Sequence, residues 1–155
     1  AGSGVITCEF SQSFTVVRVT LVEAQREEWA PHLAGNLSRL GKFEGPPSIF
    51  WGTVSEFNLK GLEKFDLILS NPPYFDPKRG RPSPDPRRNI AHRLLLDDWR
   101  AWLACMGRSL AVGGEAWYLQ KDPGPVPGKL PLPEGCTLTH EVRSGPMRLL
   151  CLRRL

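Results

Sequence analysis

Residues 65–75 read FDLILSNPPYF and carry the strongest structural signal in the chain. The run from Phe65 to Leu69 is short and apolar, which is typical of a buried strand. It ends at the polar residues Ser70 and Asn71, after which two consecutive prolines restrict the backbone. In open α/β sheets, ligands bind at the carboxyl ends of strands. The stretch therefore predicts a buried strand with a functional site directly after it.

The flanking segments alternate between strand and helix patterns. Strands are predicted at residues 16–22, 48–51, 65–69, 115–119, 137–142 and 147–152. One amphipathic helix is predicted through residues 29–40. Another is predicted through residues 95–110, capped by Asp97 or Asp98 and stopped by Gly113. Strands that alternate with helices indicate a parallel α/β sheet with helices on both faces.

Two further expectations concern the ends of this pattern. The last two strands flank Ser144-Gly145-Pro146, so they are expected to form an antiparallel hairpin. The length of 155 residues predicts a single domain over residues 1–155. Residues 76–92 are rich in Pro, Arg and Asp and lack apolar periodicity. A loop of this length inside a compact domain is usually functional.

Composition excludes several classes of protein. The four cysteines show no C-x-x-C spacing and the three histidines are isolated, so neither a disulfide scaffold nor a metal site is expected. Reduced thiols favour a cytoplasmic protein. No apolar run is long enough for a membrane span. The net charge of +4 is compatible with nucleic-acid binding.

Basic residues gather directly after the Asn-Pro-Pro motif. Between positions 78 and 93 a single acid, Asp85, is set against six basic residues: Lys78, Arg79, Arg81, Arg87, Arg88 and Arg93. Such a cluster can contact nucleic-acid phosphates, although a solvated loop would look the same. The position of the cluster after the motif favours the phosphate interpretation.

The motif itself suggests chemistry on a flat nitrogen group. Asn71 and the Pro72 carbonyl would be fixed hydrogen-bond acceptors, and Tyr74 offers an aromatic face for stacking. An exocyclic amine or primary amide is a poor nucleophile because its lone pair is delocalised. Two acceptors can hold its two N–H groups and favour a tetrahedral nitrogen, which needs orientation and no strong base. The alternative is a proline-rich turn without catalytic meaning.

A second motif lies near the start of the chain. Gly2 and Gly4 flank Ser3 in a turn that lets a ligand approach the backbone closely. Glu23 follows about twenty positions later, at the end of the next predicted strand, where an acid can bind two ribose hydroxyls. The alternative for Glu23 is a solvated carboxylate at a strand end.

Together these motifs resemble S-adenosylmethionine-dependent methyltransferases with an N-P-P-Y motif. Within that class they resemble the bacterial tRNA (adenine-N6)-methyltransferases that modify a valine tRNA. The resemblance extends over the whole chain and rests on residues 1–7, 22–25, 65–75, 90–93 and 97–99, with Gly113-Gly114 before a strand. It implies a Rossmann-like class I fold whose first strand is missing, because the chain starts inside the glycine-rich cofactor motif.

The resemblance also assigns roles to residues. The expected catalytic residues are Asn71, Pro72 and Tyr74. S-adenosylmethionine is expected to bind at Gly2, Gly4, Glu23, Thr53 and Asn71. The substrate is expected to contact Pro73, Phe75, Arg87, Arg88 and Arg93. Thr53 stands where the family often has an Asp near the cofactor adenine, and its hydroxyl can still hydrogen-bond that ring.

The implied function is methyl transfer to the N6 amine of an adenine in tRNA, by a monomer that needs no metal. Two alternatives stay open. A glutamine-N5 methyltransferase acting on a release factor would share the motif, because an amide presents the same two N–H groups. An inactive, truncated remnant would keep the motifs without turnover. Guanine-N2 methyltransferases fit less well, since they usually place Phe where this chain has Tyr74.

Overall fold

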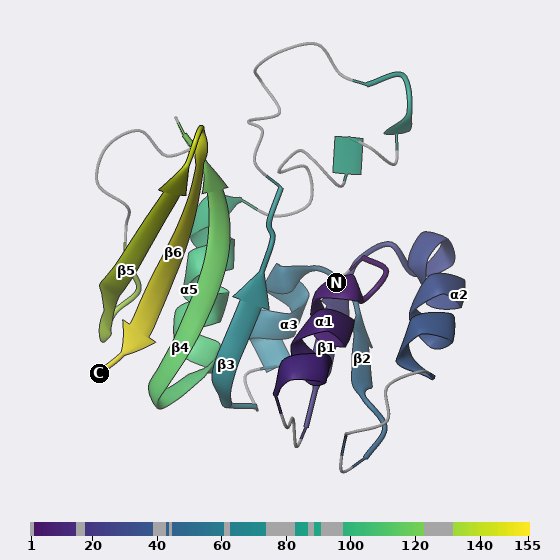
Figure 1. The fold of residues 1–155 in the computed structure, drawn as a ribbon, viewed down its shortest axis with the longest axis horizontal. Helices are drawn as coiled ribbons and strands as arrows, with labels where there is room; N and C mark the ends of the chain where they lie inside the picture. The colour runs from purple at the N-terminus through teal and green to yellow at the C-terminus, as the bar shows by residue number, and fades with distance from the viewer. Residues whose placement is uncertain are drawn as a thin grey trace. The chain divides into compact units, whose positions relative to one another are not determined.

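The structure is a computed structural model that describes residues 2–14, 18–38, 43, 45–60, 63–73, 83–86, 89–90, 98–122 and 132–155. The helices are α1 (Val5–Ser13), α2 (Arg26–Leu37), α3 (Val54–Lys60) and α5 (Trp99–Ser109). The strands are β1 (Thr20–Glu23), β2 (Ser48–Trp51), β3 (Phe65–Ser70), β4 (Leu110–Lys121), β5 (Cys136–Ser144) and β6 (Met147–Arg154). Figure 1 shows these elements along the chain, which divides into two compact units, Ala1–Phe57 and Asn58–Leu155.

The first unit contains a two-stranded parallel sheet. β1 and β2 pair in register from Thr20↔Ser48 to Glu23↔Trp51. The predicted strand at residues 48–51 is confirmed. The other prediction, a strand over residues 16–22, began too early, because Arg18 and Val19 lie outside the strand. Ser48 follows two prolines, which have no N–H to donate, so the ladder cannot extend further back.

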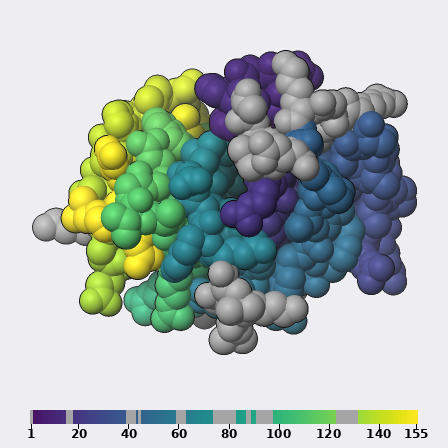
Figure 2. All heavy atoms as spheres, turned by 90° about the horizontal axis from the view of Figure 1, so that it is seen from below, coloured from purple at the N-terminus to yellow at the C-terminus, as the bar shows by residue number. Residues whose placement is uncertain are grey.

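The second unit contains a four-stranded mixed sheet in the order β3-β4-β6-β5. β3 and β4 are parallel, whereas β6 is antiparallel to both β4 and β5. The teal atoms of β3 border the green atoms of β4 in the surface view of Figure 2. The predicted strand at residues 65–69 is confirmed by β3, and the predicted hairpin by β5 and β6.

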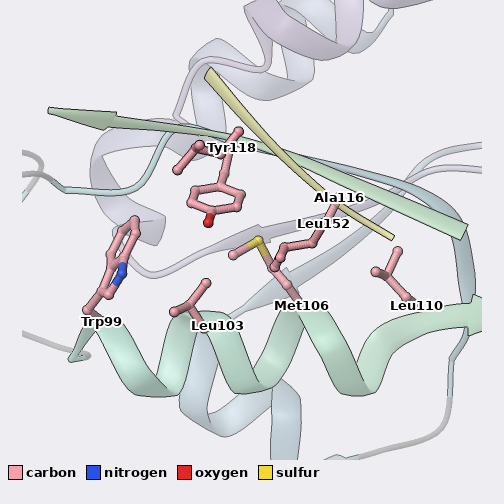
Figure 3. Close-up of a cluster of buried hydrophobic side chains, with 8 residues drawn as sticks. Trp99, Leu103, Met106, Leu110, Ala116, Tyr118 and Leu152 are labelled. Carbon is pink, nitrogen blue, oxygen red and sulfur yellow. The ribbon is translucent and has the colours of Figure 1, made fainter. Parts of the chain in front are cut away.

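The core of the second unit lies between α5 and the sheet. Its buried members are Trp99, Leu103, Met106, Leu110, Ala116, Tyr118, Leu150 and Leu152. Figure 3 shows the helical members pointing up toward the strands and Tyr118 pointing down toward α5. The rings of Trp99 and Tyr118 lie 5.8 Å apart in a tilted arrangement. Asp98 caps the helix, as predicted, by accepting a 2.7 Å hydrogen bond from the Ala101 amide.

Gly113 and Gly114 lie in strand β4 and do not end a helix. The helix over residues 95–110 was predicted to run up to Gly113, but α5 ends at Ser109 and Gly113 lies inside β4. The β3–β4 register shifts next to Phe65, and Gly113 has φ 79°. At Gly114 an added Cβ would lie 2.9 Å from the Phe65 carbonyl oxygen. The glycine pair therefore permits a bulge where the two backbones approach closely.

No helix in the part of the chain that the structure describes has both the length and the apolar character needed to cross a membrane. Among the same residues, no group of three His, Cys, Asp or Glu side chains is placed to hold a metal ion. All four cysteines are free thiols, and Cys105 and Cys151 are buried.

Candidate functional site

The glycine turn of the first unit depends on left-handed backbone conformations. Gly2 has φ 57° and Gly4 has φ 78°, and Gly4 is the N-cap residue of α1. L-residues with a side chain adopt these angles only at a cost. The turn is held from below by α2, where the Asn36 side-chain amide donates a 2.8 Å hydrogen bond to the Ser3 carbonyl.

Gly4 is also sterically enclosed. An added Cβ would lie 2.9 Å from Cδ2 of Leu33, whose side chain is fully buried. We expect Gly4→Ala to lower the free energy of unfolding by about 1–3 kcal/mol, from backbone strain and overlap together. Gly35→Ala is the matched control, because Gly35 lies in helix α2 with nothing within 4 Å of an added Cβ. It should raise stability by about 0.5–1 kcal/mol. Equal effects in urea unfolding would contradict the enclosed turn.

Glu23 joins this turn to the end of β1. Its carboxylate accepts 2.7 Å hydrogen bonds from the Gly2 amide at one oxygen and the Gln25 amide at the other. The sequence predicted that the glycine turn and Glu23 belong to one site, and the structure places them in direct contact. Both carboxylate oxygens are hydrogen-bond acceptors, the type of group that binds a ligand hydroxyl.

Electrostatics keep the Glu23 carboxylate ionised. Burial raises its pKa, but the positive amino terminus and the backbone amides of Gln25 and Gly2 outweigh burial, so the pKa lies below its usual value. A lowered folded-state pKa stabilises the fold above the unfolded pKa of about 4.3. That stabilisation is lost as the pH falls through the folded-state pKa. At neutral pH the Glu23 carboxyl group is therefore ionised.

Thr53 has a structural role that the sequence did not reveal. Its amide donates to Glu56 Oε2 at 2.7 Å, its hydroxyl lies 3.1 Å from the same oxygen, and the Glu56 amide donates back to the hydroxyl at 3.2 Å. This reciprocal pair is a capping box that starts α3. The sequence analysis missed this helix, although Thr53-x-x-Glu56 is a recognisable signal for it. Binding of the cofactor adenine by Thr53 stays a prediction.

In the second unit the Asn-Pro-Pro motif follows β3 directly. Asn71 is exposed, Pro72 is fully buried and Pro73 is half-buried. The Asn71 side chain is therefore open to a ligand, while the Pro72 ring is enclosed by the protein. The remaining predicted residues lie outside the described part of the chain: Tyr74, Phe75, Arg87, Arg88 and Arg93.

Part of the predicted loop after the motif has local order. Asn89 accepts a 2.8 Å hydrogen bond from the Ser83 amide and donates a 2.9 Å bond to the Ser83 carbonyl. The Ser83 hydroxyl in turn accepts from the Asp85 amide at 3.2 Å. These bonds join Ser83, Asp85 and Asn89 in a short turn, which the sequence did not predict.

Comparison with known proteins identifies the fold. The chain matches no protein-family model and no curated protein. Among solved structures, the candidate methylase HI0767 from Haemophilus influenzae matches with a TM-score of 0.67 and 19% identity, over 100% of this chain and 83% of its own. TrmN from Thermus thermophilus matches with a TM-score of 0.67 and 20% identity, over 99% of this chain and 42% of its own.

A third solved structure contains a bound ligand. It is the candidate methyltransferase SMU.1697c from Streptococcus mutans in complex with SAH, with a TM-score of 0.60 and 12% identity. The match covers 99% of this chain and 84% of that protein. These likenesses confirm the predicted Rossmann-like methyltransferase fold.

Proposed function

We propose that this chain is an S-adenosylmethionine-dependent methyltransferase that methylates the N6 amine of an adenine in tRNA. The observation that carries the proposal is the exposed Asn71 amide at the carboxyl end of β3, followed by the anchored Pro72. A ligand site is expected at that end of a parallel strand. The fold is shared with methyltransferases, one of which was solved with SAH, the product left when S-adenosylmethionine donates its methyl group.

The first unit would hold the cofactor. The backbone of the Gly2–Gly4 turn is free of side chains at its two glycines, so a ligand can approach it closely. The ionised Glu23 beside the turn would accept hydrogen bonds from the ribose hydroxyls. S-adenosylmethionine supplies an electrophilic methyl group on its sulfonium.

The second unit would prepare the acceptor. Asn71 Oδ1 and the Pro72 carbonyl would each accept one N–H of the target amine, and Tyr74 would stack on the base. The amine nitrogen then forms a bond to the methyl carbon as the carbon–sulfur bond breaks. The sulfur keeps the electron pair of the broken bond, and the methylated nitrogen releases one proton to solvent. The acceptors therefore face a nitrogen that gains positive charge in the transition state.

RNA is favoured over protein as the substrate by the basic residues after the motif. We expect the double substitution Arg87→Gln and Arg88→Gln to weaken tRNA binding about tenfold and to flatten the salt dependence by about 1.4 in log–log slope, for two lost phosphate contacts. Arg143→Gln is the control, because this arginine is already paired with Glu141 and Asp122. Filter binding over a salt series measures both quantities. An unchanged slope in the double variant would show that the two arginines are merely solvated.

The proposal as a whole is tested by competition between two acceptors. Labelled S-adenosylmethionine is supplied with equimolar unmodified tRNA and a release-factor peptide that carries the target glutamine. The peptide glutamine presents the same two N–H groups as the adenine amine. A preference between the two acceptors therefore reports on the class of substrate. Label in the tRNA supports the proposal. Label in the peptide alone would establish the glutamine-N5 alternative, and label in neither would indicate an inactive chain.

A further inference from the structure

Polar side chains with unused hydrogen-bonding capacity gather on one side of the second unit. Within the described part of the chain, no partner is found for Ser70 Oγ, Trp99 Nε1, the Tyr118 hydroxyl, Arg148 Nε and both polar atoms of the Gln120 amide. Gln120 and Tyr118 are each 0% exposed. Burial raises the pKa of Tyr118 to about 12, so its hydroxyl remains a neutral donor.

The strand register puts Gln120 on the core face of the sheet. Ala116, Tyr118 and Gln120 alternate along β4 and are all buried, and the first two pack against α5 (Figure 3). Trp99, which contacts Tyr118, is the first residue of α5. Gln120 is two residues further along β4, and because β4 returns antiparallel to α5, it lies beyond the start of that helix.

The register of the ladder relates Gln120 to the Asn-Pro-Pro motif. Ser70↔Tyr118 is the last pair between β3 and β4, and Pro72 and Gln120 each follow that pair by two residues. Pro72 and Gln120 are both fully buried. Asn71, which lies between Ser70 and Pro72, is exposed. Gln120 therefore lies behind the motif, on the side away from the exposed Asn71 amide.

An unpartnered amide at this place is costly. A buried amide without hydrogen bonds has lost its hydration and gained nothing in return, so an apolar side chain of equal size would be more stable. Within the motif, neither Pro72 nor Pro73 has an N–H, so its only donors are those of Asn71. Buried donors can fix its carbonyl groups, and the unpartnered Gln120 amide follows the Ser70–Tyr118 pair by two residues, as Pro72 does.

We propose that Gln120 is a positioning residue for methyl transfer. When the acceptor binds, the Gln120 amide donates a hydrogen bond to a motif carbonyl other than that of Pro72. This bond holds the motif so that the Pro72 carbonyl stays on the target amine through the transition state. The inference rests on the proposed function, and it adds a residue that acts through the motif without touching the substrate.

The test uses Gln120→Met, which keeps the size of the side chain and removes the amide. We expect the melting temperature to rise by about 2–6 °C, because an unpartnered buried amide has been removed. We expect kcat to fall about tenfold, because the motif is less well held. The KM for S-adenosylmethionine should stay unchanged. A loss of turnover that the equally stabilised control variant does not show would separate a positioning role from a general effect of added stability.

Tyr118→Phe is the matched control. It removes the Tyr118 hydroxyl, another buried group without a partner on the same face. Tyr118 pairs with Ser70, which precedes the motif. Its melting temperature should also rise, while its kcat stays within about twofold of wild type. Calorimetric melting and steady-state transfer to tRNA measure both variants.

Three outcomes would overturn the inference. A lower melting temperature for Gln120→Met would mean that the amide already has a partner in the resting protein. An unchanged kcat for Gln120→Met, with normal wild-type transfer, would refute the positioning role and leave the proposed function intact. No transfer by the wild-type protein would refute the proposed function itself, and the inference with it.

Discussion

Asn71→Ala should lower the rate of methyl transfer by about 10²–10³ and change S-adenosylmethionine affinity much less. The Asn71 side chain is exposed at the carboxyl end of β3, so its removal disturbs little packing. Its oxygen is proposed to accept an N–H of the target amine as the nitrogen becomes positively charged. An interaction that strengthens in the transition state contributes to kcat more than to binding.

Asn71→Asp tests whether the side-chain oxygen, which this substitution keeps, is what the reaction needs. The aspartate oxygen can accept the same N–H from nearly the same place, so its rate should stay within about tenfold of wild type. Single-turnover kinetics on unmodified tRNA measures the chemical step for both variants. Wild-type turnover in Asn71→Ala would contradict the role of the motif, and equal losses in both variants would contradict the role of the oxygen.

Glu23→Gln should weaken S-adenosylmethionine binding by about 1–3 kcal/mol, which corresponds to about 5–150-fold in Kd. The change keeps the shape of the side chain but removes the charge that the Gly2 and Gln25 amides stabilise. It also turns one acceptor into a donor that faces those amides or the ribose hydroxyls. Calorimetric titration with S-adenosylmethionine measures the effect.

Glu27→Gln is the control for the loss of charge. Glu27 lies in the first turn of α2, four residues from Glu23, and its side chain is exposed. It should bind S-adenosylmethionine as wild type does. Because the carboxylate form of Glu23 also stabilises the turn, thermal melting of each variant shows whether the protein remains folded at the titration temperature. Unchanged affinity in folded Glu23→Gln would refute the ribose role.

Sequence periodicity predicted the elements whose patterns are local. The apolar run at β3, the Asn-Pro-Pro motif after it and the turn between β5 and β6 are each encoded in consecutive residues. The sequence also predicted that the glycine turn and Glu23 serve one site, since an acid about twenty residues after a glycine turn is a spacing with a known physical use. Their direct hydrogen bond is a finding of the structure.

What the sequence could not show depends on contacts between distant segments. Gly113 reads as a helix stop, and only the close approach of β4 to β3 makes it part of a bulge. Gln120 has a polar side chain, and only its place on β4, in alternation with the buried Ala116 and Tyr118, shows that it lies on the core face of the sheet. The cap of α3 is the exception, since Thr53-x-x-Glu56 could have been recognised from the sequence.

We propose that this chain methylates the N6 amine of an adenine in RNA. The most direct measurement is to incubate the protein with S-adenosylmethionine and unmodified tRNA, digest the RNA to nucleosides, and identify the methylated product by mass spectrometry. We expect N6-methyladenosine with the wild-type protein, formed at an initial rate about 10²–10³-fold higher than with Asn71→Ala. A methyl group on any other nucleoside, or no methylated nucleoside at all, would contradict it.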